Sequence, residues 1–190
     1  MTPNRATSLL VAALVLSGCD HGGPSFTPFL SFSYSGAAAG TFNAAGTPPA
    51  NESSNKAWAV GIKGSATAST IAVVALMPTT GGTSLVAGLE IPAAGTGTLT
   101  ISPSCGTGST TCGTMGIVFG FVSATGSSTL YCALESGSIV VTKLTAERAA
   151  GTFSGTGTCT DVNSANPASI SVADGSFEVA LMAGGSAQGF

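Results

Sequence analysis

Apolar and polar residues alternate one by one along most of this chain, a pattern typical of antiparallel strands with one buried and one wet side. The pattern is clearest from Ser136 to Leu181, on either side of a short polar turn at 146–148. One side of this stretch is apolar: Ile139, Val141, Phe153, Ile170, Val172, Phe177, Val179 and Leu181. The residues around Phe153 are hydroxylic: Thr152, Ser154, Thr156 and Thr158. The stretch therefore predicts a set of strands against which the rest of the chain is laid.

Further strands are expected upstream, each ending at Gly, Pro or polar turn residues. Their ranges are 30–34, 40–44, 58–62, 70–77, 84–91, 96–101, 115–122 and 129–135. The segments 70–77 and 115–122 are apolar at both parities, which predicts strands buried on both sides. Trp58 shares its parity with Val60 and Ile62, so we expect a core position for this aromatic residue.

About ten or eleven short strands, with no helical period after residue 28, predict an all-β fold. The expected architecture is an antiparallel β-sandwich or flattened barrel, formed by residues 29–190 as a single domain. Composition agrees, because 27 glycines and only 7% charged residues favour strands and turns over helices. Five Lys and Arg against eight Asp and Glu leave no basic patch. This balance excludes nucleic acid and anionic lipid head groups as charge-driven partners.

The N-terminus has the features of an export signal. Arg5 precedes the apolar run 9–16, and the small residues Ser17 and Gly18 stand directly before Cys19. The tetrad 16–19 resembles the lipobox of bacterial lipoproteins, which implies cleavage before Cys19 and a lipid thioether on its sulfur. Residues 1–18 are then a signal peptide, and 19–28 a flexible tether. We expect a protein of the bacterial cell envelope, held on a membrane by its lipid, on the periplasmic or cell-surface side; the alternative is an ordinary signal peptide with an incidental cysteine.

The domain keeps an even number of cysteines after lipidation, which in an exported protein favours disulfide bonds. They are Cys105, Cys112, Cys132 and Cys159. Three pairings are possible. We favour Cys105 with Cys112, across a short hairpin loop, which leaves Cys132 with Cys159. A four-thiolate zinc site is the competing interpretation, but it usually needs closely spaced pairs of cysteines.

The residues that usually carry catalysis are scarce. His21 is the only histidine and lies in the tether, which argues against a Ser-His-Asp triad or a histidine-bound metal in the domain. Glu90, Glu135 and Glu178 fall on the polar parity of their strands, so we expect them in solvent. The oxygen-rich segment 161–166 lacks the glycine and the distant glutamate of a calcium loop. We therefore assign no catalytic, cofactor-binding or metal-binding residue.

The C-terminal strands carry a family resemblance. The segments 136–144, 151–154 and 172–177 resemble the closing motif of small bacterial lipoproteins classed as a domain of unknown function. The resemblance implies an antiparallel β-domain on a lipid tether, and it brings no activity. Val172 and Phe177 are five residues apart, so Asp174-Gly175 forms either a tight hairpin turn or a bulge with Gly175 at positive φ. The resemblance favours the bulge.

Three classes of function stay open. A non-catalytic envelope lipoprotein that acts by binding or by contact with other envelope components leads, its protein or glycan ligand unassigned. A carbohydrate-binding or adhesive module would need an exposed aromatic row, for which Tyr34, Trp58 and Tyr131 are the candidates. A carboxylate-dependent hydrolase would need two acidic side chains facing each other in a cleft.

Overall fold

The computed structural model describes residues 26–49, 56–64, 70–79, 84–105, 109–123, 126–161 and 166–183. The fold is all-β, as predicted, with ten strands in one mixed sheet. The strands are β1 (Phe29–Gly36), β2 (Gly40–Ala45), β3 (Trp58–Lys63), β4 (Thr70–Pro78), β5 (Ser84–Pro92), β6 (Gly97–Ile101), β7 (Cys112–Ser123), β8 (Gly126–Leu144), β9 (Arg148–Asp161) and β10 (Ala168–Ala183). In the part of the chain covered by these ranges, no helix is long and apolar enough to cross a bilayer.

The sheet closes on itself through hydrogen bonds. The ring runs β3-β4-β5-β7-β8-β9-β10 and returns to β3, because Leu181 of β10 pairs in parallel with Gly61. Strand β1 pairs with the earlier part of β10 and carries β2 on its outer edge. Strand β6 lies between the start of β7 and the C-terminal half of β8. The result is a flattened barrel, in agreement with the predicted fold class.

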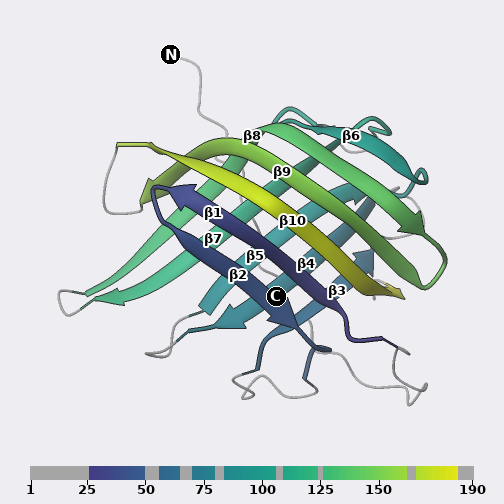
Figure 1. Cartoon of the computed structure of the whole chain (residues 1–190), viewed down its shortest axis with the longest axis horizontal. Coiled ribbons are helices and arrows are strands. Elements are labelled where there is room, and N and C mark those ends of the chain that lie inside the picture. The colour runs from purple at the N-terminus through teal and green to yellow at the C-terminus, as the bar shows by residue number, and fades with distance from the viewer. Residues whose placement is uncertain are drawn as a thin grey trace.

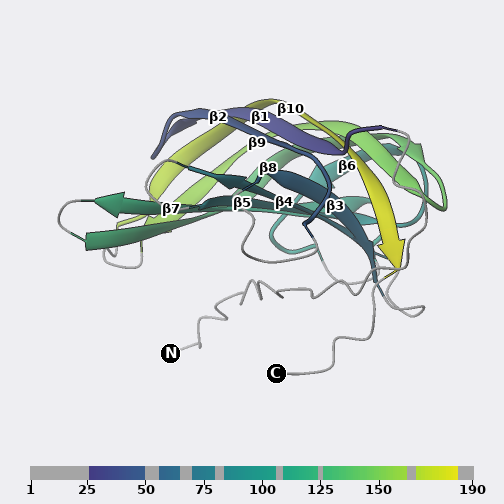
Figure 2. The ribbon, with the colours of Figure 1, turned by 90° about the horizontal axis from the view of Figure 1, so that it is seen from below.

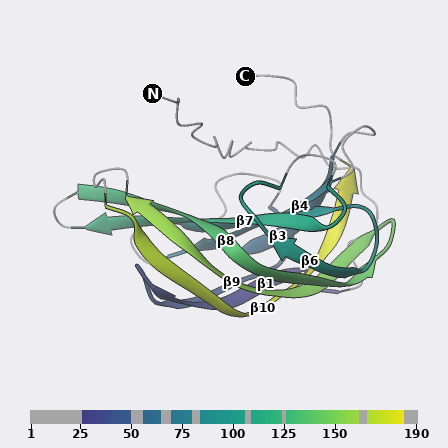
Figure 3. The same ribbon diagram turned by 90° about the horizontal axis from the view of Figure 1, so that it is seen from above.

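Flattening gives the barrel two layers. Strands β1, β2, β9 and β10 and the C-terminal half of β8 form one curved layer, while β3, β4, β5 and β7 form the other (Figures 1 and 2). The view from the opposite side shows the same two layers, with β6 at one end (Figure 3). The core lies between them. Its aromatic part comes from the first layer: Phe32, Phe42, Phe153 and Phe177. Its aliphatic part comes largely from the second: Ile71, Val73, Leu85, Leu89, Ile91, Met115 and Ile117.

Strand β10 shows why one face of the first layer stays apolar along its whole length. Its pairing with β9 shifts between Val172 and Gly175, so the extra residue is absorbed in a bulge and the strand continues. The bulge is the predicted alternative, but the positive φ belongs to Asp174, at 54°, and not to Gly175. Gly175 is required for another reason. A Cβ atom there would lie 2.4 Å from the ring of Phe153.

Strand β8 corrects a predicted boundary. The sequence indicated a strand at 129–135 and a separate stretch that begins at Ser136, whereas the structure has one strand of 19 residues. Register shifts near Glu135 and Thr142 bend this strand without ending it, and Gly137 at φ 137° adapts to the first of them. Because the strand is continuous, Cys132 stands directly opposite Cys159 on β9.

Strand β3 corrects a predicted orientation. Ala59 and Gly61 face the core, so Trp58, Val60 and Ile62 lie on the outer side of the second layer. Val60 is buried on that side, but Trp58 is only half-buried, so the core position expected for Trp58 is wrong. The reason is the close approach of β10. A Cβ atom on Gly61 would lie 2.5 Å from a methyl carbon of Leu181, so only the parity with small residues fits inside.

Burial on both sides was expected for two strands, and for β4 this expectation is corrected. In β4, Ile71, Val73 and Ala75 are buried while the residues between them are only half-buried. In β7, Met115, Gly116 and Ile117 are all buried, as expected, while Val118 is half-buried. These strands have a core side and an outer side, and both sides are apolar.

Candidate functional site

The cysteines form two disulfide bonds, with the pairing that the sequence favoured. Cys105 is bonded to Cys112, and Cys132 to Cys159. The second bond joins neighbouring strands in the interior, where both sulfur-bearing residues are buried. The first closes the loop before β7. Disulfide-bonded sulfur cannot act as a nucleophile or hold a metal as a thiolate, so these residues are structural.

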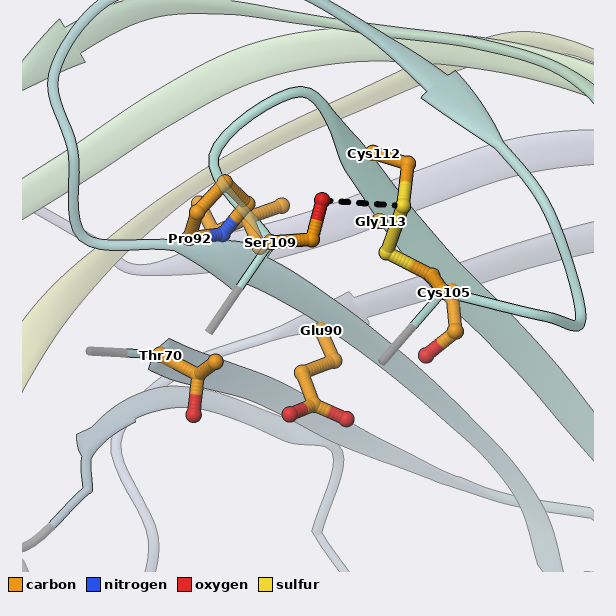
Figure 4. A pocket seen from close by; sticks show the side chains of 9 residues that line it. Thr70, Glu90, Pro92, Cys105, Ser109, Cys112 and Gly113 are labelled. Carbon is orange, nitrogen blue, oxygen red and sulfur yellow. Dashed lines mark hydrogen bonds between the residues drawn. A yellow bond between two sulfur atoms is a disulfide. The ribbon is translucent and has the colours of Figure 1, made fainter. Parts of the chain in front are cut away.

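A small pocket lies beside the Cys105–Cys112 bond, between the end of β5 and the start of β7 (Figure 4). Its lining includes Thr70, Glu90 and Ser109, and the Ser109 hydroxyl lies 3.2 Å from Sγ of Cys112. A disulfide sulfur has no proton, so the hydroxyl is the donor in this contact. The cavity volume is about 20 Å³, roughly what one water molecule needs. The pocket is therefore too small for a substrate or cofactor.

The acidic residues are spread over different parts of the barrel. Glu90 and Glu135 are exposed, as predicted, and Glu135 accepts a 2.7 Å hydrogen bond from the Thr158 hydroxyl. Asp174 lies at the β10 bulge, where the Ser33 hydroxyl is 3.4 Å away. Among the described residues no three of His, Cys, Asp and Glu gather as a metal site would require. Cys19, His21 and the middle of the segment 161–166 lie outside the described residues.

Glu178 is engaged in a local ion pair. Its Oε1 atom lies 2.9 Å from Nε of Arg148, which makes the contact an ion pair. The Arg148 guanidinium also stacks on the ring of Phe26, 3.6 Å from its centroid. This cation–π contact fixes the last part of the tether to the start of β9. The cluster positions the tether and offers no catalytic pair.

A broad polar surface is formed by the outer side of the first layer together with β6, and we call it the hydroxyl face. It consists of the outward side chains of β1, β2, β6, β9, β10 and the C-terminal half of β8. One row crosses all of these strands in register: Asn43, Ser31, Ser176, Thr152, Val140 and Thr98. A second row contains Ser35, Ser171, Thr156 and Ser136. A third contains Thr41 and Ser33 at one end and Ser154, Ser138 and Thr100 at the other.

Among the described residues, few hydrogen bonds join the hydroxyl groups of this face to each other. Ser136 and Thr156 share one at 2.9 Å, and Ser33 and Thr142 donate to nearby backbone carbonyl groups. Thr152, Ser154 and Thr156 are exposed on β9. Each hydroxyl can donate one hydrogen bond and accept two, so the rows present a regular array of both functions. The sequence showed the row along β9, but only the strand order joins it to the other rows.

The aromatic residues do not form a row for sugar stacking. Tyr131 is 48% exposed, and it lies on the opposite side of the barrel, beside Val118. Trp58 is half-buried on the same side. Tyr34 packs against the core from β1, and its burial raises the pKa of its phenol. Within the described residues, the requirement that we set for an aromatic carbohydrate-binding platform is not met.

Similarity to known proteins adds no further information about this site. A comparison of the chain with models of protein families, with curated protein sequences and with solved structures finds no match in any of the three.

Proposed function

We propose that this protein is a lipid-anchored lipoprotein of the bacterial cell envelope whose β-domain acts by binding through the hydroxyl face. The observation that carries the proposal is the array of outward side chains, mostly Ser and Thr, in rows over β2, β1, β10, β9, β8 and β6; the one row that crosses all six strands also contains Asn43 and Val140. Thr side chains have few rotamers, so little conformational entropy is lost when a ligand orders them. The array suits an extended ligand with many hydrogen-bonding groups, of which an envelope polysaccharide is the simplest example.

The anchor is supported by the lipobox at 16–19 and by the way in which the tether joins the domain. Phe26 is held on Arg148, and the carbonyl group of Pro28 accepts a 2.9 Å hydrogen bond from Gly46. Mass spectrometry of the membrane fraction should find an acylated N-terminus that begins at Cys19. The Cys19→Ser variant should fail to be processed at that position. A soluble wild-type protein with an unmodified Cys19 would end the proposal of an anchor.

Binding by the hydroxyl face is tested by removing its hydroxyls while keeping their shape. The double variant Thr152→Val/Thr156→Val loses two hydroxyl groups from β9, and Thr111→Val is its control at an exposed position outside the face, beyond the edge strand β6. Each ligand hydrogen bond contributes about 0.5–1.5 kcal/mol, so sedimentation with insoluble cell-wall polysaccharide should weaken roughly tenfold in the double variant. The control should bind as the wild type does. Equal binding by all three proteins, or no binding by the wild type, argues against this face and this ligand class.

A further inference from the structure

The outer side of the second layer differs from the hydroxyl face in kind. We call it the apolar face: Trp58, Val60, Ile62, Ala72, Val74, Leu76, Val86, Gly88, Gly116 and Val118. Val60 and Gly116 are buried, and the other members are half-buried. One of its rows runs in register across four strands and continues to β8: Trp58, Leu76, Val86, Val118 and Tyr131. This row begins and ends with an aromatic residue that has a polar group. The next row is Val60, Val74, Gly88 and Gly116, and it contains no polar side chain at all.

Apolar residues at these positions are not needed for the core. Their neighbours Ala59, Val73, Ala75, Ala87 and Ile117 fill the interior from the same strands. In the described ranges no strand lies over the outer side of β3, β4, β5 and β7 (Figure 2). A contiguous apolar surface of this kind marks an interaction site in a soluble domain.

The tether points to what covers this face. Gly46 joins the tether to β3, because its N–H donates to Pro28 and its carbonyl accepts from Ala59, the neighbour of Trp58. The tether therefore ends one strand away from the start of the apolar face. From Cys19 to Phe26 there are seven residues, which span at most roughly 25 Å when fully extended. A lipid on Cys19 would keep the domain within that distance of the bilayer.

We propose that the apolar face rests on the surface of the lipid bilayer and holds the domain against the membrane. The proposal rests on the lipid anchor put forward above, and adds a second contact to it. Trp and Tyr are enriched at the membrane interface, which fits Trp58 and Tyr131 at the two ends of one row. The rows from Trp58 to Val118 and from Val60 to Gly116 contain no charged side chain, and Glu90 lies at the edge of the face, in the row of Ile62 and Ala72. Attraction to the bilayer is therefore apolar, and it adds to the hold of the acyl chains.

The mature chain without its lipid separates this contact from the anchor. A chain that begins at position 19 with Cys19→Ser is mixed with phosphatidylcholine vesicles and floated on a density gradient. Val74→Thr/Val86→Thr makes the apolar face more polar while keeping β-branched side chains. Val140→Thr is the same change on the hydroxyl face, where Val140 is half-buried between Thr98 and Thr152. We expect the wild type and Val140→Thr to float equally, and the double variant to bind roughly tenfold more weakly. High salt should not release the wild type.

Several results would overturn the proposal. One is a wild-type chain that does not float, and another is a double variant that floats as well as Val140→Thr. A third comes from sedimentation analysis in the absence of vesicles. If the wild type is a dimer that Val74→Thr/Val86→Thr converts to a monomer, the face joins two copies of the chain and not the chain to a membrane. Failure of the lipid anchor is seen separately, in the mass of the N-terminus, so the two proposals can fail independently.

Discussion

The two layers of the barrel both bury an apolar inner side, but their outer sides differ. Both place apolar side chains inside, aromatic rings from β1, β2, β9 and β10 and mostly aliphatic groups from β4, β5 and β7. Outside, the first layer presents hydroxyl groups, while the second presents a second set of apolar groups. Folding requires only the inner side of a layer to be apolar. The apolar outer side of the second layer therefore suggests a role other than folding. This difference supports our two proposals, that the polar layer meets solvent and hydrogen-bonding partners and that the apolar layer meets a surface that excludes water.

The largest expected loss of stability comes from replacing an inward-facing phenylalanine of the first layer, compared with an outward-facing one. Phe177 is 1% exposed and lies 6.4 Å from Phe153, ring centroid to ring centroid. Phe177→Ala should lower the free energy of unfolding by about 3–5 kcal/mol, because burial is lost and a cavity remains. Phe29→Ala changes the same residue type at the outward parity of β1 and should cost much less. Urea unfolding measures both, and equal losses would contradict the inside–outside assignment.

The next effect compares the two disulfide bonds. Cys132–Cys159 joins β8 to β9 and spans 27 residues, whereas Cys105–Cys112 closes the loop before β7 and spans seven. Replacing either pair with alanine should cost a few kcal/mol, about 2–4. The longer loop restricts the unfolded chain more, so loss of Cys132–Cys159 should cost about 1 kcal/mol more. Thermal or urea unfolding of the two double variants measures both losses of stability. A larger loss for the Cys105–Cys112 pair would contradict the prediction.

Two glycine substitutions compare a position where a Cβ atom would clash with one where it would have free space. In Gly175→Ala the new methyl group meets the Phe153 ring, so we expect a loss of about 1–3 kcal/mol. Gly88 lies on the apolar face of β5, where a Cβ atom would have no neighbour within 4 Å. Gly88→Ala should be neutral or stabilise by up to about 1 kcal/mol, because it restricts the unfolded chain. Equal effects in a denaturation experiment would show that crowding at Gly175 does not matter.

The smallest effect concerns pH. Burial raises the pKa of Tyr34 in the folded protein above the value of about 10 for an unfolded chain. Below that value both states hold the phenol proton, so the contribution of Tyr34 to stability is fully present. As pH rises through the folded pKa the unfolded state loses its proton first, and stability falls. Urea unfolding in the alkaline range should show a shallower decline for Tyr34→Phe than for the wild type. Identical slopes would contradict the desolvation of Tyr34.

The first layer could be predicted from the sequence because its alternation is chemically unambiguous. Phe153 lies between Thr152 and Ser154, so only one parity can face the core, and the same is true of Phe32 between serines. The disulfide pairing followed from spacing, although its register depends on bulges in β8 that the sequence did not indicate. The rows of the hydroxyl face could not be read from the sequence, because they depend on which strands are neighbours.

The sequence did not show which side of the second layer faces the core, because both sides of its strands are apolar. Both parities of β3 and β4 are apolar, so hydrophobicity does not select the inner side. In β3 the decision comes from a non-local contact, since Leu181 and Val179 of β10 leave no room for a Cβ atom at Gly61. The two-sided apolar pattern suggested burial on both sides. It marks instead the face that we propose for the membrane.

The position of Trp58 relative to the bilayer tests the central claim most directly. Trp58 is the only tryptophan, so its fluorescence reports on the apolar face alone. In the lipidated protein, bound to vesicles, brominated lipids should quench Trp58 strongly. In the variant Trp58→Phe/Thr156→Trp the fluorophore moves to the hydroxyl face, and quenching should be nearly absent. Equal quenching of the two proteins, or stronger quenching at position 156, would contradict the assignment of the apolar face to the membrane.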